Sequence, residues 1–204
     1  MVKQLRLKKY WDKKTGLIKS LFFYKGVLCI IKQLLELLKS IVIAIIAAFL
    51  IITFVFETVR VDGYSMNPTL NNNDRLIVEK VTYYFRQPEP GDIVVIKYPA
   101  NTEEKFIKRV VAVQGNTVEI KNNTLYINGI AKKENYILED TMSDFSKVTV
   151  PQGTIFVMGD NRNNSRDSRY PDVGFVSTSL VVGRAVLRIY PFSNFGLLTA
   201  SVNN

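Results

Sequence analysis

Hydrophobic positions divide the chain into two parts with different patterns. Residues 40–56 form an uninterrupted apolar run, SIVIAIIAAFLIITFVF, between Lys39 and Glu57. A helix of that length measures about 26 Å, near the short end of the range that crosses a bilayer. Because no polar face interrupts the run, we expect a transmembrane anchor here in preference to a buried core helix.

The segment before the anchor is mixed in character. Residues 16–39 are rich in apolar side chains, but lysines recur among them. This mixture is typical of an amphipathic helix at the membrane interface, so we predict residues 1–39 as a basic cytoplasmic or interfacial segment. A second membrane crossing is an open alternative, although it would bury Lys25 or Lys32. A cleaved signal peptide is disfavoured, since no small-x-small site follows the apolar run.

Beyond Phe56 the apolar positions occur in short β-branched runs between turn residues. This pattern predicts a mainly β domain, of mixed or antiparallel strands, over residues 57–204. The pair Asn122-Asn123 between two such runs is typical of a two-residue hairpin turn. The expected strands are 58–62, 75–81, 93–98, 106–113, 118–121, 124–127, 147–150, 154–158 and 180–189.

The formal net charge of +9 is concentrated before the apolar run. Residues 1–39 contain ten Lys and Arg against two acidic residues, whereas residues 40–204 contain 17 against 16. A nearly neutral β domain argues against nucleic-acid binding. Lysines before an apolar run favour a cytoplasmic N-terminus. We therefore expect a single-pass protein of the plasma membrane, with residues 57–204 outside and the lipid bilayer as one partner.

The composition excludes several chemistries. The sequence contains no histidine and one cysteine, Cys29. These counts exclude a Ser-His-Asp triad, a Cys-His pair, an internal disulfide and a CxxC pair, and they argue against a zinc enzyme. We expect neither a metal nor another cofactor.

Three polar segments interrupt the β pattern. In residues 63–70 (GYSMNPTL) a turn presents Ser65, either as a nucleophile or, more commonly, as a turn residue with a local hydrogen bond. In residues 106–113 (FIKRVVAV) Lys108 has apolar neighbours; a snorkelling lysine on an edge strand is an equally open alternative. Residues 159–169 (GDNRNNSRDSR) contain no hydrophobic residue, as in a solvated loop or in one that Asp–Arg pairs lock.

A serine nucleophile needs a base that is neutral near pH 7. In a chain without histidine, a desolvated lysine is the natural candidate, because burial lowers the pKa of its amine. The pKa must fall by roughly 3 units from about 10.4, which corresponds to about 4 kcal/mol. Arg109 cannot serve, since a guanidinium keeps its proton in proteins. The pattern alone leaves open which of Lys108 and Arg109 faces an active centre.

Taken together and in this order, four segments resemble the motifs of the type I (leader) signal peptidases, which are membrane-anchored Ser-Lys proteases. These segments are SMNPTL, GDIVV (91–95), KRVVAVQGN (108–116) and GDNRNNSRDSR. The resemblance implies an antiparallel β catalytic domain that cleaves signal peptides from exported preproteins without a cofactor. It also implies that Ser65 is the nucleophile and Lys108 the general base.

The resemblance implies supporting roles as well. Ser165 would hydrogen-bond the lysine amine and orient it, and Asp167 and Arg169 would form an ion pair that holds their loop. Asp160 belongs to the same motif. Five residues would line shallow pockets for small substrate side chains: Val61, Met66, Leu70, Phe106 and Ile107.

The oxyanion site differs among members of the family. Gly63 stands where some members have a serine whose hydroxyl completes the oxyanion hole. The Ser65 N–H is then the one donor that the sequence identifies.

Two other classes of protein are alternatives. A membrane-anchored β binding module, or an inactive relative, would share the anchor and the strands but would not need Ser65 together with Lys108. A self-cleaving repressor also uses a serine and a lysine, but it needs a soluble DNA-binding N-terminus. A sortase-like transpeptidase is excluded by the absence of histidine and of any cysteine in residues 57–204.

Overall fold

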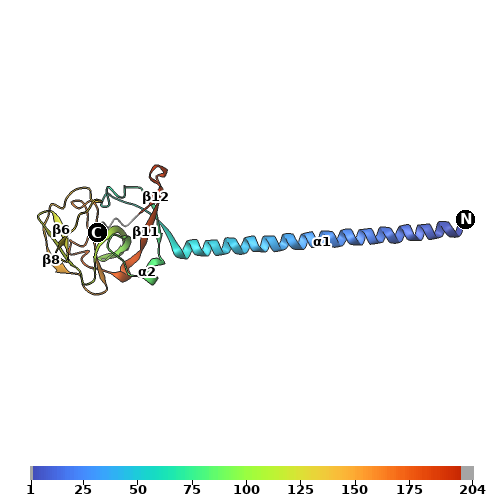
Figure 1. Ribbon diagram of the computed structural model, residues 1–204, viewed down its shortest axis with the longest axis horizontal. Helices are drawn as coiled ribbons and strands as arrows, with labels where there is room; N and C mark the ends of the chain where they lie inside the picture. The colour runs from blue at the N-terminus through green and yellow to red at the C-terminus, as the bar shows by residue number, and fades with distance from the viewer. Residues whose placement is uncertain (1, 199–204) are drawn as a thin grey trace. The chain divides into compact units, whose positions relative to one another are not determined.

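The computed structural model describes residues 2–198, and for residues 2–23, 25 and 27 it describes the backbone alone. The chain divides into two compact units near Ile51. The first consists of most of helix α1 (Val2–Val55), which is one continuous helix in Figure 1. The second holds all the strands.

One helical stretch in the described part of the chain, Leu28–Val55, is long and apolar enough to cross a membrane. The predicted anchor of residues 40–56 lies within this stretch except for Phe56, and Lys32, Glu36 and Lys39 precede it in the same helix. Phe56 was predicted as the last residue of the anchor, but it is not helical. It is the first residue of a strand and pairs with Glu79. Residues 16–39 are helical, but part of the side chains that would form the predicted interfacial face lie outside the described residues.

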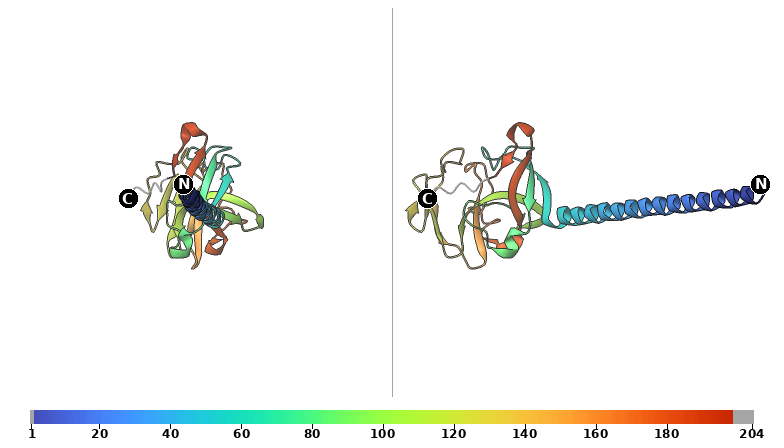
Figure 2. Two further views of the ribbon diagram at one scale, coloured as in Figure 1. Left: turned by 90° about the vertical axis from the view of Figure 1, so that its right-hand side faces the viewer. Right: turned by 45° about the vertical axis from the view of Figure 1, so that its right-hand side comes forward.

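The larger sheet is antiparallel throughout and has the order β1-β2-β11-β3-β4-β9-β10, with β12 paired to β11. In the views of Figure 2 the red β11 lies beside the cyan and green strands that open the domain. Its strands are β1 (Phe56–Arg60), β2 (Arg75–Glu79), β3 (Ile93–Tyr98), β4 (Asn101–Val113), β9 (Thr154–Met158), β10 (Val176–Ser177), β11 (Val181–Tyr190) and β12 (Gly196–Leu197).

A smaller antiparallel sheet has the order β7-β6-β5-β8. Its strands are β5 (Thr117–Lys121), β6 (Thr124–Ile127), β7 (Ile130–Ala131) and β8 (Phe145–Thr149). The remaining elements are the short helix α2 (Thr82–Phe85) and two single 3₁₀ turns, Thr178–Leu180 and Phe192–Asn194. The antiparallel, mainly β architecture confirms the predicted fold class.

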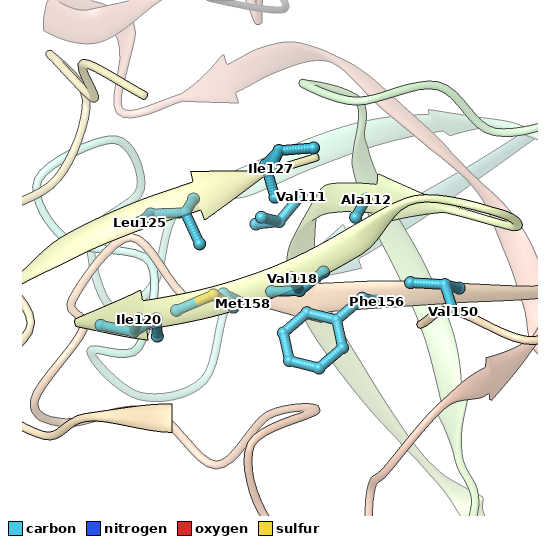
Figure 3. Packing of buried hydrophobic residues seen from close by; sticks show 9 residues of the cluster. All are labelled: Val111, Ala112, Val118, Ile120, Leu125, Ile127, Val150, Phe156 and Met158. Carbon is cyan, nitrogen blue, oxygen red and sulfur yellow. The ribbon is translucent and has the colours of Figure 1, made fainter. Parts of the chain in front are cut away.

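The two sheets share a hydrophobic core. In Figure 3 the side chains of β5 and β6 gather with those of β4 and β9, which include Phe156 and Met158 of β9. The larger sheet is buried on both faces at β3, where Ile93 and Val95 join one cluster and Val94 joins another. Burial on both faces explains why this strand reads as a continuous apolar run and does not alternate.

The agreement with the predicted strands depends on burial. Strands β3, β6 and β9 have the predicted bounds, and the Asn122-Asn123 turn has positive φ angles of 49° and 62° within a two-residue hairpin. Strand β4 begins at Asn101, five residues before the predicted start. Its first five residues are all exposed, so no alternation of polar and apolar positions marks them.

Gly183 lets strand β11 pack closely on β2. A Cβ at this position would lie 2.3 Å from the carbonyl oxygen of Glu79, which is backbone and cannot move aside. We expect Gly183→Ala to lower the free energy of unfolding by about 1–3 kcal/mol. The matched control is Gly196→Ala in β12, where a Cβ has no atom within 4 Å. Denaturant unfolding of the detergent-solubilised chain measures both, and equal stability of the two variants would contradict the prediction.

Candidate active site

Ser65 lies in the irregular turn that follows β1. The turn is entered through Gly63, whose φ of +96° is readily adopted only by glycine. The Gly63 N–H donates to Asn72 Oδ1 at 3.0 Å, and the Leu70 N–H donates to the carbonyl oxygen of Met66 at 2.8 Å. These bonds fix the turn on both sides of Ser65, whose side chain is half-buried.

Lys108 lies in β4, between β3 and β9, and it pairs with Val94. It is therefore not on an edge strand, and at 4% exposure it does not snorkel to solvent. Its Nζ donates to Ser65 Oγ at 2.9 Å and to the carbonyl oxygen of Ile107 at 3.0 Å. The nitrogen also lies 5.1 Å from the centre of the Phe106 ring. The alternative reading of Lys108 as a solvated edge-strand lysine is thus wrong.

The surroundings of Lys108 change its acidity. Burial lowers the pKa of the Lys108 amine to about 8, against the opposing attraction of the Asp167 and Asp160 carboxylates. With such a pKa, on the order of one amine in ten is neutral at pH 7. A neutral amine has a lone pair that can accept the proton of the hydroxyl that it contacts. The pair therefore has the geometry and the acidity of a nucleophile with its base.

The loop of residues 159–169 is locked by an internal ion pair. Arg169 donates to both oxygens of Asp167 at 2.8 Å, and it donates to the carbonyl oxygen of Arg162 at 2.6 Å. Asp167 also accepts from the Gly159 N–H at 3.0 Å. The Asp167 side chain is fully buried and that of Arg169 is 8% exposed. The Asp–Arg pair that the sequence predicts is formed, and the loop is ordered and packed at this point.

Asp160 ties the same loop to the strand that carries Lys108. Arg109 donates to the two Asp160 oxygens at 2.9 and 2.7 Å, and both residues are at most 1% exposed. Arg109 also donates to the carbonyl oxygen of Gly91 at 3.0 Å, and Thr69 Oγ1 donates to Asp160. Sequence reasoning excluded Arg109 as a base but missed this role and that of Thr69. The one sequence feature that could have indicated the role of Arg109 was the set of apolar neighbours that it shares with Lys108.

A third buried ion pair braces the loop from the segment after β7. Arg162 donates to Glu134 Oε1 at 2.7 Å. The Tyr136 ring lies against two guanidinium groups, 4.1 Å from that of Arg109 and 5.9 Å from that of Arg162. Neither Glu134 nor Tyr136 belongs to a motif that could have been recognised in the sequence, because only the fold brings them to the loop.

Ser165 lies at the centre without the predicted hydrogen bond. A Cβ on Gly159 would lie 2.3 Å from both Ser165 Oγ and the carbonyl oxygen of Ser65, so the two serines approach closely. Ser165 is 7% exposed, and its hydroxyl has no hydrogen-bond partner in the described part of the chain. The Lys108 amine instead donates to Ser65 and to Ile107.

The five expected pocket residues fall into two groups. Val61, Met66 and Leu70 belong to a core cluster and are 4%, 1% and 0% exposed, so they offer a substrate almost no surface. Phe106 and Ile107 are half-buried and lie immediately before Lys108. Among the residues with described side chains, no group of three or more His, Cys, Asp or Glu could hold a metal ion.

Comparison with known proteins identifies the class. The family described as "Signal peptidase, peptidase S26" matches residues 34–190. A Synechocystis sp. protein named "Probable signal peptidase I-2" is 43% identical over 170 residues, which cover 81% of this chain and 77% of that protein. Signal peptidase I S of Bacillus subtilis is 39% identical over 173 residues, 79% of this chain and 92% of that protein.

A crystal structure of a signal peptidase I from Enterococcus faecalis V583 is 36% identical and has a TM-score of 0.44. The match covers 48% of this chain and 97% of that chain. On the sequence matches, the chain is a hydrolase of the serine peptidase class. It belongs to the signal peptidase I family, as the motifs predicted.

Burial of the Lys108 amine has a cost that a neutral side chain avoids. Its pKa is about 8 in the folded chain against 10.5 when exposed, so the protein must release a proton or bury a charge below pH 10.5. The contribution of Lys108 to the free energy of unfolding is lowest below pH 8 and rises between pH 8 and 10.5. We expect Lys108→Met to be more stable at pH 7, by about 3 kcal/mol at most, with a difference that shrinks toward pH 10.

Denaturant unfolding from pH 6 to 10 tests this, with the exposed Lys147→Met as control. A Lys108→Met variant that is less stable at pH 7 than the unchanged protein would refute the burial cost.

Proposed function

We propose that the chain is a membrane-bound signal peptidase that uses Ser65 and Lys108 as a catalytic dyad. The observation that carries the proposal is the 2.9 Å contact between a half-buried hydroxyl and a buried amine whose pKa is about 8. A binding module has no use for this pair, and its cost in stability would be unexplained. Membership of the family supports the same reading.

In the first step Lys108 accepts the Ser65 proton while Ser65 Oγ attacks the carbonyl carbon of the scissile peptide. A bond forms between Oγ and carbon, and the π electrons of the carbonyl move to its oxygen. The Ser65 N–H donates to this oxyanion. The C–N bond then breaks, the Lys108 ammonium protonates the leaving amine, and an ester remains on Ser65. Lys108 next takes a proton from water, whose oxygen attacks the ester carbon. The bond between that carbon and Ser65 Oγ then breaks, Ser65 recovers the proton from Lys108, and the new carboxylic acid leaves.

The supporting residues of this proposal act on the dyad through the loop of residues 159–169. Asp160 joins the loop to the strand of Lys108, and the pair of Asp167 with Arg169 keeps the loop closed. Ser165 lies beside the dyad. Its hydroxyl can form a hydrogen bond with the Lys108 amine once Ser65 Oγ has moved from the amine to attack the carbonyl carbon. Each role is positional, since none of these side chains supplies the nucleophile, the base or the oxyanion donor of the proposed mechanism.

The proposed substrates are the signal peptides of exported preproteins. An extended segment with small side chains would pack against Phe106, whose ring lies 5.1 Å from the amine, and Ile107, whose carbonyl oxygen accepts from the amine. Val61, Met66 and Leu70 would form the wall behind this surface and limit the size of the side chains that enter. No metal or cofactor takes part in the proposed steps.

The proposed location is the plasma membrane. Leu28–Val55 is long enough to span it, and its exposed apolar side chains suit lipid. The ten basic residues of positions 1–39 favour a cytoplasmic N-terminus and an outer catalytic domain. The substrate's own apolar segment would then lie in the same bilayer as the anchor.

Substitution of each dyad residue tests the proposal. Ser65→Ala removes the nucleophile, and Lys108→Arg keeps a cation that cannot release its proton. We expect each to reduce preprotein cleavage by the detergent-solubilised enzyme at least about 10³-fold. Ser146→Ala and Lys147→Arg, exposed on β8, are matched controls and should cleave normally. Circular dichroism verifies folding, and cleavage by a folded Ser65→Ala variant would rule out the dyad.

The pH dependence of cleavage reports the base. Lys108 must be neutral to accept the proton, and burial lowers its pKa to about 8. We expect kcat/KM to rise about tenfold per pH unit below the pKa and to level off near pH 9. Initial rates from pH 5 to 9.5 measure this. A flat profile would show that no lysine titrates in the rate-limiting step.

A further inference from the structure

Both peptide groups that flank the Ser65 Cα are held by one residue, Asn161. Its side-chain Nδ2 donates to the carbonyl oxygen of Tyr64 at 3.2 Å, and its backbone N–H donates to the carbonyl oxygen of Ser65 at 3.0 Å. Asn161 is 7% exposed and lies in the loop of residues 159–169. Two elements that are 97 residues apart in the sequence are thereby fixed to each other at the nucleophile.

The bond to Tyr64 also sets the direction of a neighbouring N–H. The Tyr64–Ser65 peptide bond is trans, so its carbonyl and its N–H lie in one plane and point in opposite directions. Fixing the Tyr64 oxygen therefore fixes the Ser65 N–H. In the described part of the chain this N–H donates to no other group. It is the donor that the proposed mechanism uses for the oxyanion.

We propose that the Asn161 side chain is a positioning residue that aims the Ser65 N–H at the oxyanion through the carbonyl of Tyr64. The inference rests on the proposed function, in which Ser65 is the nucleophile. Preorganised donors of this kind act mainly on the transition state, where the negative charge develops. In the described part of the chain the Asn161 side chain has no hydrogen bond to Ser65 Oγ or to the Lys108 amine, so its effect must pass through the peptide group.

The turn's own hydrogen bond does not replace this contact. The Asn67 N–H also donates to the carbonyl oxygen of Tyr64, at 3.1 Å. Because Asn67 belongs to the same turn as Tyr64, this bond moves with the turn. It does not fix the orientation of the turn relative to Lys108. Asn161 belongs to the loop that the buried Asp160–Arg109 pair holds against β4, the strand of the base. It therefore orients the donor relative to Lys108.

Two variants separate the side chain from the backbone of residue 161. Asn161→Ala removes the Nδ2 donor, and Asn161→Asp keeps the shape but turns an acceptor toward the Tyr64 oxygen. Both retain the backbone N–H that holds Ser65, so the loop keeps this attachment. Asn164→Asp makes the same chemical change at an exposed position of the loop and is the control.

The measurements are kcat and KM for a preprotein, and the inhibition constant of a peptide aldehyde that ends at the cleavage site. Such an aldehyde adds the serine oxygen at its carbon and places an oxyanion at the Ser65 N–H. We expect both Asn161 variants to lower kcat about 10- to 100-fold and to weaken the aldehyde by a similar factor. KM should stay within about threefold. In Asn161→Ala, which adds no charge near Lys108, the midpoint of the pH profile should not move.

The outcomes separate the inference from the proposed function. Unchanged kcat and aldehyde binding in folded Asn161 variants would overturn the inference. The proposed dyad would still stand if the Ser65→Ala variant is inactive. A loss confined to KM, or a shifted pH midpoint in Asn161→Ala, would also overturn it, because general displacement of the loop disturbs the substrate surface and Lys108. Cleavage by Ser65→Ala would overturn the proposed function itself. If Asn161→Ala fails to fold, the Asn161→Asp variant decides.

Discussion

The site depends on keeping one amine out of water beside a hydroxyl. Lys108 lies in a central strand, so its aliphatic chain is enclosed by backbone and apolar side chains and its nitrogen reaches Ser65 Oγ. Burial disfavours the ammonium form, and the proposed mechanism uses the neutral amine as its base in a chain that has no histidine. The same burial makes the pair costly, because a buried cation lacks hydration. The rest of the domain therefore has to stabilise the conformation in which the Lys108 amine is buried beside Ser65.

The loop of residues 159–169 meets two opposing requirements. It must be anchored by buried charges, yet carboxylates near Lys108 raise the pKa of its amine. In the structure each buried carboxylate has its own arginine: Asp160 pairs with Arg109, and Asp167 pairs with Arg169. Because each pair is close to neutral as a unit, the loop is locked while the lysine keeps a lowered pKa. Gly159 completes the arrangement, since any Cβ there would collide with Ser65 and Ser165.

The smaller sheet contributes to the site from a distance. The segment that follows β7 carries Glu134 and Tyr136, which brace Arg162 and Arg109, and the Leu138 N–H donates to the carbonyl oxygen of Asp160 at 3.1 Å. This segment continues from β7, which pairs with β6, and β6 packs into the core that the two sheets share. Packing between β5, β6, β4 and β9 is thereby linked to the geometry of the loop. A domain without the smaller sheet would leave two buried guanidinium groups without part of their support.

Much of this protein follows from the sequence itself. The uncharged run predicted a long apolar helix, β-branched runs predicted the buried strands, and the order of four motifs predicted the family. The same motifs singled out Ser65 and Lys108, whose side chains meet in the structure. Each of these depends on local patterns or on residue types that the chemistry requires. The exposed start of β4, the roles of Thr69, Glu134 and Tyr136, and the two peptide groups held by Asn161 depend on tertiary structure. Contacts between residues far apart in the chain leave no period or spacing, because only folding decides which buried donor meets which acceptor.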